Sequence, residues 1–118
     1  MIKDVFNQEV EIEEKSGSLW IRPKGELTIV SANIISKNIT EKVAEKSLPT
    51  VIDMTNVEYI DSASIGVIAN LTKAYRKKKL GLYLFNPSKL VTEVLDQVGI
   101  TKVIRTFHKV EDLPESVR

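Results

Sequence analysis

From residue 31 onward, short apolar runs alternate with stretches in which apolar residues recur every three or four positions. The apolar runs lie at residues 50–54, 82–86 and 102–107. Short runs of this kind, bounded by polar segments, are typical of strands that are buried on both faces of a sheet. Strands that alternate with helices of this length favour right-handed crossovers and parallel pairing. The pattern therefore predicts an α/β fold with a central, mostly parallel β-sheet.

The N-terminal segment has a different period, which predicts an antiparallel hairpin. Residues 8–15 alternate apolar and charged side chains, as a half-exposed strand does. A turn follows at residues 16–18, and residues 19–25 supply the partner strand, in which Pro23 marks an edge or a strand end. We therefore expect one domain over residues 1–118, with this hairpin beside the parallel strands and about four helices packed against the sheet.

The predicted helices carry recognisable terminal signals. Ser31 is the expected N-cap of the first helix, and Gly81 and Gly99 are the expected C-terminal caps of the second and third helices. The expected core face of the third helix consists of Leu90, Val91, Val94, Leu95 and Val98. A short last helix is expected within residues 110–117, where Pro114 interrupts or begins it.

Composition narrows the class of protein. The chain has 118 residues, of which 42% are hydrophobic and 28% are charged, and its net charge of +1 gives no overall field toward nucleic acid or an anionic membrane. The absence of cysteine excludes disulfides and thiolate chemistry. No apolar run approaches the roughly 20 residues that a membrane helix needs. We expect a cytoplasmic protein that neither inserts into a membrane nor binds nucleic acid directly.

The junction at residues 59–68, YIDSASIGVI, places a carboxylate and two hydroxyls where a strand-derived loop enters a helix. Asp61 is well placed to cap this helix, and Ser62 and Ser64 fall in its first turn, near backbone N–H groups without a partner inside the helix. Such a junction can be a plain cap, a nucleophile, an anion site or a modification site. In the plain interpretation, the two serines are ordinary first-turn residues and Gly66 permits close packing.

A phosphate on Ser62 would be compatible with the helix that carries it. The positive end of the helix dipole favours negative charge there by about 0.3–1 kcal/mol. Phosphorylation would add a charge of about −1.5 to −2 beside Asp61 and would change the surface offered to a partner. The local residue types leave both the plain cap and this switch open.

Longer segments resemble the STAS family, which joins sulfate transporters with anti-sigma factor antagonists. The resemblance rests on VIDMTNV at residues 51–57 with the junction YIDSASIGVI, on RPKGEL at residues 22–27, and on LYLFNPSKLVTEVLDQVGITKVI at residues 82–104. These segments span nearly the whole chain and occur in the family's order. The resemblance implies a STAS-like domain.

In the stand-alone antagonists of this family, the serine that follows the aspartate accepts phosphate from a kinase that is also the anti-sigma factor. The resemblance therefore implies that Ser62 is the phosphoacceptor. It also implies that the unmodified chain binds the anti-sigma factor and frees a sigma factor, that phosphorylation ends this binding, and that a serine phosphatase restores it. The implied partner-binding residues are Gly25, Glu26, Thr28, Asp61, Ser62, Ala63, Ser64, Ile65 and Gly66.

Three positions depart from the family pattern and keep alternatives open. Ala63 and Ser64 stand where the family usually has Ser or Thr followed by Gly, so Ser64 is an alternative acceptor. Thr28 stands where an acidic residue is often found.

Because of these departures, a second hypothesis is an unphosphorylated STAS adaptor in a signalling or transport complex. A third, an enzyme with Ser62 as nucleophile, lacks a base, so we assign no catalytic residue. Whether the chain forms a homodimer stays open.

The remaining polar residues give weaker signals. His108, the only histidine, is expected to face solvent at a strand end rather than to bind a metal. The acidic residues Asp53, Asp61, Glu26 and Asp96 show no convergent spacing for acid–base chemistry. Asp53 is expected to bond to a nearby loop backbone. We expect no metal, because the only histidine has no cysteine or close acidic partner at metal-ligand spacing. We expect no cofactor, and the chain lacks a glycine-rich phosphate loop.

Two further features concern the surface and the core. The basic run KAYRKKK at residues 73–79 is expected to be a solvated helix end that complements the helix dipole, with a docking patch for an acidic partner as the alternative. Trp20 is expected to lie in the core or on the packed face of the hairpin, and it is a weak candidate for a partner contact.

Overall fold

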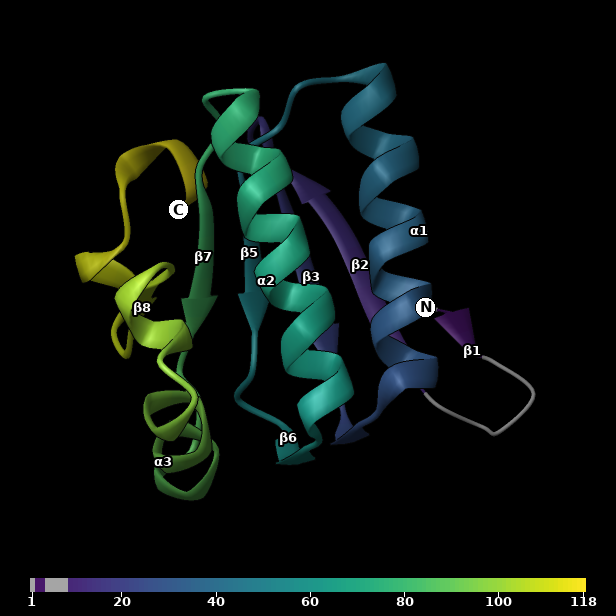
Figure 1. Ribbon diagram of the computed structural model, residues 1–118. Coiled ribbons are helices and arrows are strands. Elements are labelled where there is room, and N and C mark those ends of the chain that lie inside the picture. The colour runs from purple at the N-terminus through teal and green to yellow at the C-terminus, as the bar shows by residue number, and fades with distance from the viewer. Residues whose placement is uncertain (1, 4–8) are drawn as a thin grey trace.

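A six-stranded sheet forms the centre of the computed structural model, which describes residues 2–3 and 9–118 (Figure 1). Its strands, in spatial order, are β1 (Ile2–Lys3), β2 (Glu9–Lys15), β3 (Ser18–Pro23), β5 (Thr50–Asp53), β7 (Leu82–Phe85) and β8 (Arg105–Phe107). The first three strands pair antiparallel, whereas β3, β5, β7 and β8 pair in parallel. The predicted hairpin and the mostly parallel sheet are therefore confirmed. Residue 8, the expected start of the first hairpin strand, lies outside the described residues.

Three α-helices occur in the described part of the chain: α1 (Ile29–Glu45), α2 (Ser62–Lys77) and α3 (Lys89–Gln97). Helices α1 and α2 cover one face of the sheet, and α3 lies beside the end of β7 (Figure 1). The expected fourth helix was wrong. Two 3₁₀ turns, η2 (Val110–Asp112) and η3 (Glu115–Val117), take its place, because Pro114 has no N–H with which to continue a helix.

The last strand is shorter than its apolar run suggested. A 3₁₀ turn, η1 (Ile100–Lys102), occupies the region where we expected the strand to begin, and β8 starts only at Arg105. Ile104, just before the strand, is buried in the core and does not belong to the strand itself.

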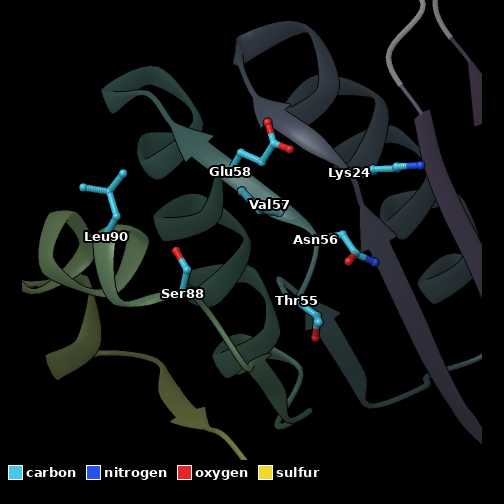
Figure 2. Close-up of a pocket in the computed structure, with 7 residues that line it drawn as sticks. All are labelled: Lys24, Thr55, Asn56, Val57, Glu58, Ser88 and Leu90. Atoms are coloured by element: carbon cyan, nitrogen blue, oxygen red, sulfur yellow. The ribbon is translucent and has the colours of Figure 1, made fainter.

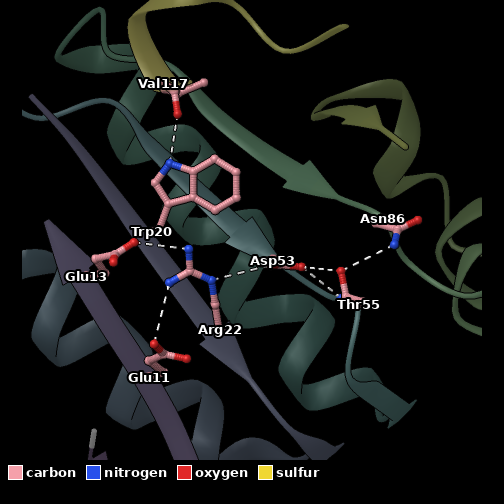
Figure 3. A network of polar contacts seen from close by, with 8 residues as sticks. All are labelled: Glu11, Glu13, Trp20, Arg22, Asp53, Thr55, Asn86 and Val117. Carbon is pink, nitrogen blue, oxygen red and sulfur yellow. Dashed lines mark hydrogen bonds and ion pairs between the residues drawn. The ribbon is translucent and has the colours of Figure 1, made fainter. Parts of the chain in front are cut away.

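Alternating side chains of the central strands build two cores. Leu19, Ile21, Ile52 and Leu84 are fully buried in the main core, to which α1 and α2 contribute. Trp20 belongs to a smaller cluster with Val51, Leu113 and Val117, which the C-terminal turns supply. The Trp20 indole Nε1 donates a 2.7 Å hydrogen bond to the backbone oxygen of Val117 (Figure 3). Trp20 is therefore a core residue that fastens the end of the chain to the sheet.

A polar network next to Trp20 links the neighbouring strands β2, β3 and β5 (Figure 3). The Arg22 guanidinium lies 3.1 Å from Glu13, 3.8 Å from Glu11 and 3.5 Å from Asp53. The Asp53 carboxylate also accepts the backbone N–H of Thr55 at 3.0 Å, as expected for this residue. Because the Asp53 carboxylate is bound to Arg22 and to its own loop, its role is structural.

A second, two-stranded sheet was not predicted as a separate unit. Strands β4 (Gly25–Leu27) and β6 (Val57–Ile60) pair in parallel, with Glu26 opposite Tyr59 and Leu27 opposite Ile60. Each strand runs directly into a helix, β4 into α1 and β6 into α2. The small sheet therefore holds the starts of these two helices side by side.

Two of the predicted helix caps were wrong. The N-cap of α1 is Thr28, while Ser31 lies three residues later and accepts the Thr28 N–H at 2.9 Å in a capping box. Helix α2 ends at Lys77, and Lys79 adopts the left-handed backbone with φ of 57°. Gly81 instead leaves room for the Tyr83 ring, which a Cβ at this position would meet. The third prediction is confirmed, because Gly99 follows α3 with φ of 78°.

The expected core face of α3 was too wide. Val91 and Leu95 are fully buried, and Val94 packs partly against the main core. Leu90 is 58% exposed and Val98 is 55% exposed. A helix of nine residues at the border of the sheet covers the core with only one narrow stripe, so its remaining apolar side chains stay on the surface.

Candidate functional site at the start of helix α2

The junction at residues 59–68 lies where the short strands end and the helices α1 and α2 begin (Figure 1). The Asp61 N–H donates to the Leu27 backbone oxygen at 3.2 Å, so the β4–β6 pairing continues up to Asp61, the residue before α2. This edge, at the carboxyl ends of parallel strands, is the usual functional edge of an α/β sheet.

Asp61 caps α2, as predicted. Its carboxylate accepts the backbone N–H of Ser64 at 2.8 Å, and the Ser64 hydroxyl lies 2.6 Å from the same oxygen. The Ser64 hydroxyl also lies 2.8 Å from the Leu27 backbone oxygen. Ser64 is fully buried. Its hydroxyl therefore ties the start of α2 to the end of β4.

The pKa of Asp61 reflects this environment. Burial alone raises the pKa, but hydrogen bonds from the Ser64 hydroxyl, the Ser64 N–H and the Ile29 N–H outweigh burial and hold the pKa below the ordinary value of 3.8. Ile29 is the first residue of α1. The Asp61 carboxylate is thus negatively charged at neutral pH and receives donors from the starts of two helices.

Ser62 has the opposite environment. It is the first residue of α2, and its side chain is exposed, as is that of Ala63. The two serines of the junction, two positions apart, therefore point to different surroundings, one to solvent and one to the interior. The sequence alone could not distinguish them.

The other predicted partner-binding residues fall on the same part of the surface or just beneath it. Glu26 is exposed, Gly25 and Thr28 are half-buried, and Ile65 is buried under the first turn of α2. Gly66 is exposed, and a Cβ on it would meet open space. The plain interpretation supposed that Gly66 permits close packing, but none of the residues that the structure describes packs against it. The missing side chain instead leaves the surface beside Ser62 uncovered.

Two residues near this site were missed by sequence reasoning. Tyr59 is 51% exposed on β6 and Ile29 is 41% exposed at the start of α1, although isoleucine is usually buried and tyrosine is intermediate. Tyr59 stands opposite the exposed Glu26 in the small sheet. The position of Tyr59 within a run of strand residues suggested burial, and the exposure of its face becomes visible only when β6 is paired with β4.

A shallow depression of about 490 Å³ lies near the same edge (Figure 2). It is lined by Lys24, Thr55, Asn56, Val57, Glu58, Ser88 and Leu90. Lys24 and Glu58 balance each other in charge, and the exposed Leu90 adds an apolar wall. The depression thus extends the surface around β6 toward the start of α3.

The remaining candidates do not form a site. His108 is exposed just after β8, as expected. Asp53 binds Arg22, Asp61 binds Ser64, and the Asp96 carboxylate accepts the Thr101 hydroxyl at 2.7 Å. Within residues 2–3 and 9–118, no three histidine, aspartate or glutamate side chains gather as metal ligands would. The helices in these same ranges all fall short of the length and apolar content needed to cross a membrane.

Comparison with known proteins gives the family. A model of the STAS domain matches residues 9–113. The anti-sigma-B factor antagonist of Bacillus subtilis (strain 168) is 25% identical over 106 residues, which is 90% of this chain and 96% of that protein.

Solved structures share the fold. The anti-sigma factor antagonist SpoIIAA in its unphosphorylated form matches with a TM-score of 0.70 at 18% identity, covering 88% of this chain and 92% of that one. The phosphorylated form of the Bacillus cell fate determinant SpoIIAA gives a TM-score of 0.69 at 17% identity, with 88% and 95% covered. The murine anion transporter Slc26a9 matches over 85% of this chain and 17% of its own, with a TM-score of 0.69 at 18% identity. Because the family model spans most of the chain and the fold agrees, the chain belongs to the STAS domain family.

Proposed function

We propose that this chain is an anti-sigma factor antagonist that works by partner switching. In its unmodified form it binds an anti-sigma factor with serine kinase activity and frees a sigma factor. Phosphorylation of Ser62 ends this binding, and a serine phosphatase restores it. The chain acts through binding and catalyses no reaction of its own.

The exposure of Ser62 carries the proposal. Its side chain reaches solvent from the first turn of α2, while the neighbouring Asp61 and Ser64 are held by hydrogen bonds of 2.6–2.8 Å. A kinase can therefore approach the Ser62 hydroxyl without unfolding the helix. Ser64, the alternative acceptor, is fully buried and hydrogen-bonded, which argues against its modification in the folded chain.

A phosphate at Ser62 would change the charge of the surface more than its shape. It would add about −1.5 to −2 beside a carboxylate that is already ionised. The positive end of the α2 helix dipole would accommodate this charge. The capping bonds of Asp61 would persist, because they point inward to Ser64. The fold would stay intact, and a partner that packs against α2 would meet a dense negative charge.

The surroundings of Ser62 suit a protein partner. Tyr59 on β6 and Ile29 at the start of α1 expose apolar area, and Gly66 has no side chain that would cover the surface beside Ser62. Tyrosine is enriched in the energetic centre of interfaces. The relatives named as antagonists of anti-sigma factors support the choice of partner. SpoIIAA has been solved in both unphosphorylated and phosphorylated forms, which supports the choice of switch.

Phosphorylation with the cognate anti-sigma factor and ATP tests the proposal. Intact mass should show one added phosphate, and peptide mapping should place it on Ser62. The Ser62→Ala variant should accept none. The Ser47→Ala variant, which changes an exposed serine beyond the far end of α1, should be modified like the wild type. One phosphate on Ser62→Ala would refute Ser62 as the acceptor.

A second candidate function is an unphosphorylated STAS adaptor in a signalling or transport complex. The fold match to a region of an anion transporter favours it, as does the presence of Ala63 and Ser64 at the departing positions. In that case the chain purified from its own cells would carry no phosphate and would copurify with a transporter or receptor subunit in place of a kinase.

A further inference from the structure

Five cations lie at and just beyond the end of α2 that is farthest from Ser62. This cluster consists of Lys73, Arg76, Lys77, Lys78 and Lys79, and all are exposed. Where the structure describes the side chains, ion pairs form at Arg22 and Lys46, and none of these five cations takes part in one. A charge complement for this cluster is therefore missing from the described part of the chain.

A hollow of about 280 Å³ lies beside this cluster, between α2 and the turn that follows α3. It is lined by Ala69, Thr72, Lys73, Arg76, Val98, Gly99, Ile100 and Val103. Val98 is 55% exposed and Val103 is 41% exposed. The Arg76 guanidinium donates a 2.8 Å hydrogen bond to the Val103 backbone oxygen, which holds the two walls together. We call this hollow the α2 groove. Its apolar side chains lie directly beside two cations.

A smaller hollow of about 150 Å³ lies on the opposite flank of α2, against α1. Its lining is mostly apolar and consists of Ile39, Thr40, Val43, Leu71, Ala74, Tyr75 and Lys78. The basic end of α2 is thus a ridge with an apolar hollow on each side. This arrangement suits a partner that presents both apolar and acidic side chains.

Complementing the helix dipole does not account for the whole arrangement. That effect is confined to the last turn, which contains Arg76 and Lys77. Lys73 lies one turn earlier and lines the α2 groove. The dipole also gives no reason for Val98 and Val103 to be exposed next to the cations. Apolar area rimmed by charge is the usual composition of an interaction surface.

We propose that the α2 groove binds an acidic amphipathic segment of a partner protein. The apolar side chains of the segment would cover Val98 and Val103, and its carboxylates would pair with Lys73 and the neighbouring cations. Nucleic acid is disfavoured, because Tyr75, the one aromatic residue of this ridge, is 3% exposed with its hydroxyl 2.7 Å from that of Thr50. A membrane surface is disfavoured, because the apolar side chains line two separate hollows and do not form the continuous apolar face of a membrane-surface helix. The surface is separate from Ser62, so its occupancy does not depend on the phosphorylation state.

Two synthetic peptides test this proposal. Both form a helix with leucines on one face, and the other face carries glutamate in the first peptide and lysine in the second. Binding to the full chain is measured by fluorescence polarisation, and the contacted residues are mapped by NMR chemical shifts. We expect only the glutamate peptide to bind, with shifts at residues 69–76 and 98–103, and we expect its affinity to fall as salt is raised.

Matched variants locate the contact. Lys73→Glu and Val98→Asp should each weaken binding of the glutamate peptide by roughly tenfold. Lys37→Glu on α1 and Val110→Asp, where the valine is 47% exposed, make the same chemical changes elsewhere and should leave binding unchanged. Ser62→Asp should also have no effect, which separates this proposal from the proposed switch.

Several results would overturn the inference. Equal binding of both peptides would show that charge plays no part, and shifts confined to other residues would place the contact elsewhere. Absence of binding by the glutamate peptide would also count against it. Tighter binding of phosphatidylglycerol vesicles or of a single-stranded oligonucleotide to the same residues would replace the proposed partner with a membrane or a nucleic acid.

Discussion

Removal of the Ser64 hydroxyl should weaken the fold, although Ser62→Ala, the same change two residues earlier, should not. The Ser64→Ala variant lacks the hydroxyl that lies 2.6 Å from the Asp61 carboxylate and 2.8 Å from the Leu27 backbone oxygen. Both acceptors keep a donor, since Asp61 retains the Ser64 N–H and Leu27 retains the Asp61 N–H. A hydrogen bond to a charged group contributes about 1.5–3 kcal/mol. With no acceptor left bare, the cost should lie near the low end, at about 1.5–2 kcal/mol.

Urea unfolding, followed by the fluorescence of Trp20, measures this cost. Trp20 is the only tryptophan, is 3% exposed, and makes its hydrogen bond to the C-terminal turns, so it reports on global unfolding. With a urea slope of about 2 kcal/mol per molar, the midpoint of Ser64→Ala should fall by about 1 M. Exposed Ser62→Ala should stay within about 0.5 kcal/mol of the wild type. Unchanged stability of Ser64→Ala, or an equal loss in both variants, would refute the different roles assigned to the two serines.

Two further changes follow from the helix ends. Asp61→Asn should lower the free energy of unfolding at neutral pH, because the depressed pKa of Asp61 means that its ionised form stabilises the fold. This stability is present above the ordinary pKa of 3.8 and is lost as pH falls through the lower folded-state pKa. The difference in urea midpoint between variant and wild type should therefore shrink as the pH is lowered below 3.8, and a difference that stays constant would contradict the assignment. Lys79→Gly should raise the thermal midpoint, with a gain of up to about 1 kcal/mol, because φ of 57° is costly for lysine and free for glycine. Gly81→Ala should not stabilise the protein, since its Cβ would meet the Tyr83 ring.

The fold was predictable from the sequence because its main determinants are local. Apolar runs such as residues 50–54 and 82–86 have the length of buried strands, and the helical stripe through Ile65, Ile68 and Leu71 is long enough to be unambiguous. The wrong predictions concern the ends of helices and strands, where neighbouring residues can end the element at similar free energy. Gly81 looked like a cap, yet the chain turns at Lys79, because the helix stops where its apolar stripe leaves the core.

The candidate site was predictable only in part. Asp61 as a cap follows from residue type and position, and the geometry agrees. The burial of Ser64 and the exposure of Ser62 depend on the end of β4. There the backbone oxygen of Leu27, 37 residues before Ser64 in the chain, accepts the Ser64 hydroxyl. The exposure of Tyr59 and Ile29 likewise depends on the β4–β6 pairing. Such long-range contacts leave no trace in local spacing.

The α2 groove illustrates the same limit. The basic run at residues 73–79 is plain in the sequence, and alone it indicates no more than a solvated helix end. Val98 and Val103 looked like core residues because their spacing matched the apolar stripe of α3 and the apolar run after it. The structure shows that both valines are exposed beside Lys73 and Arg76. This combination of apolar and basic side chains is what suggests an acidic, amphipathic partner.

The affinity of the anti-sigma factor for the unmodified chain and for the chain phosphorylated on Ser62 tests the central claim most directly. Isothermal titration calorimetry should show tight binding of the unmodified chain and a loss of at least roughly tenfold on phosphorylation, with unchanged urea midpoints for the two forms of the chain. Equal affinity of the two forms would contradict the proposal that the charge on Ser62 decides which partner the chain binds.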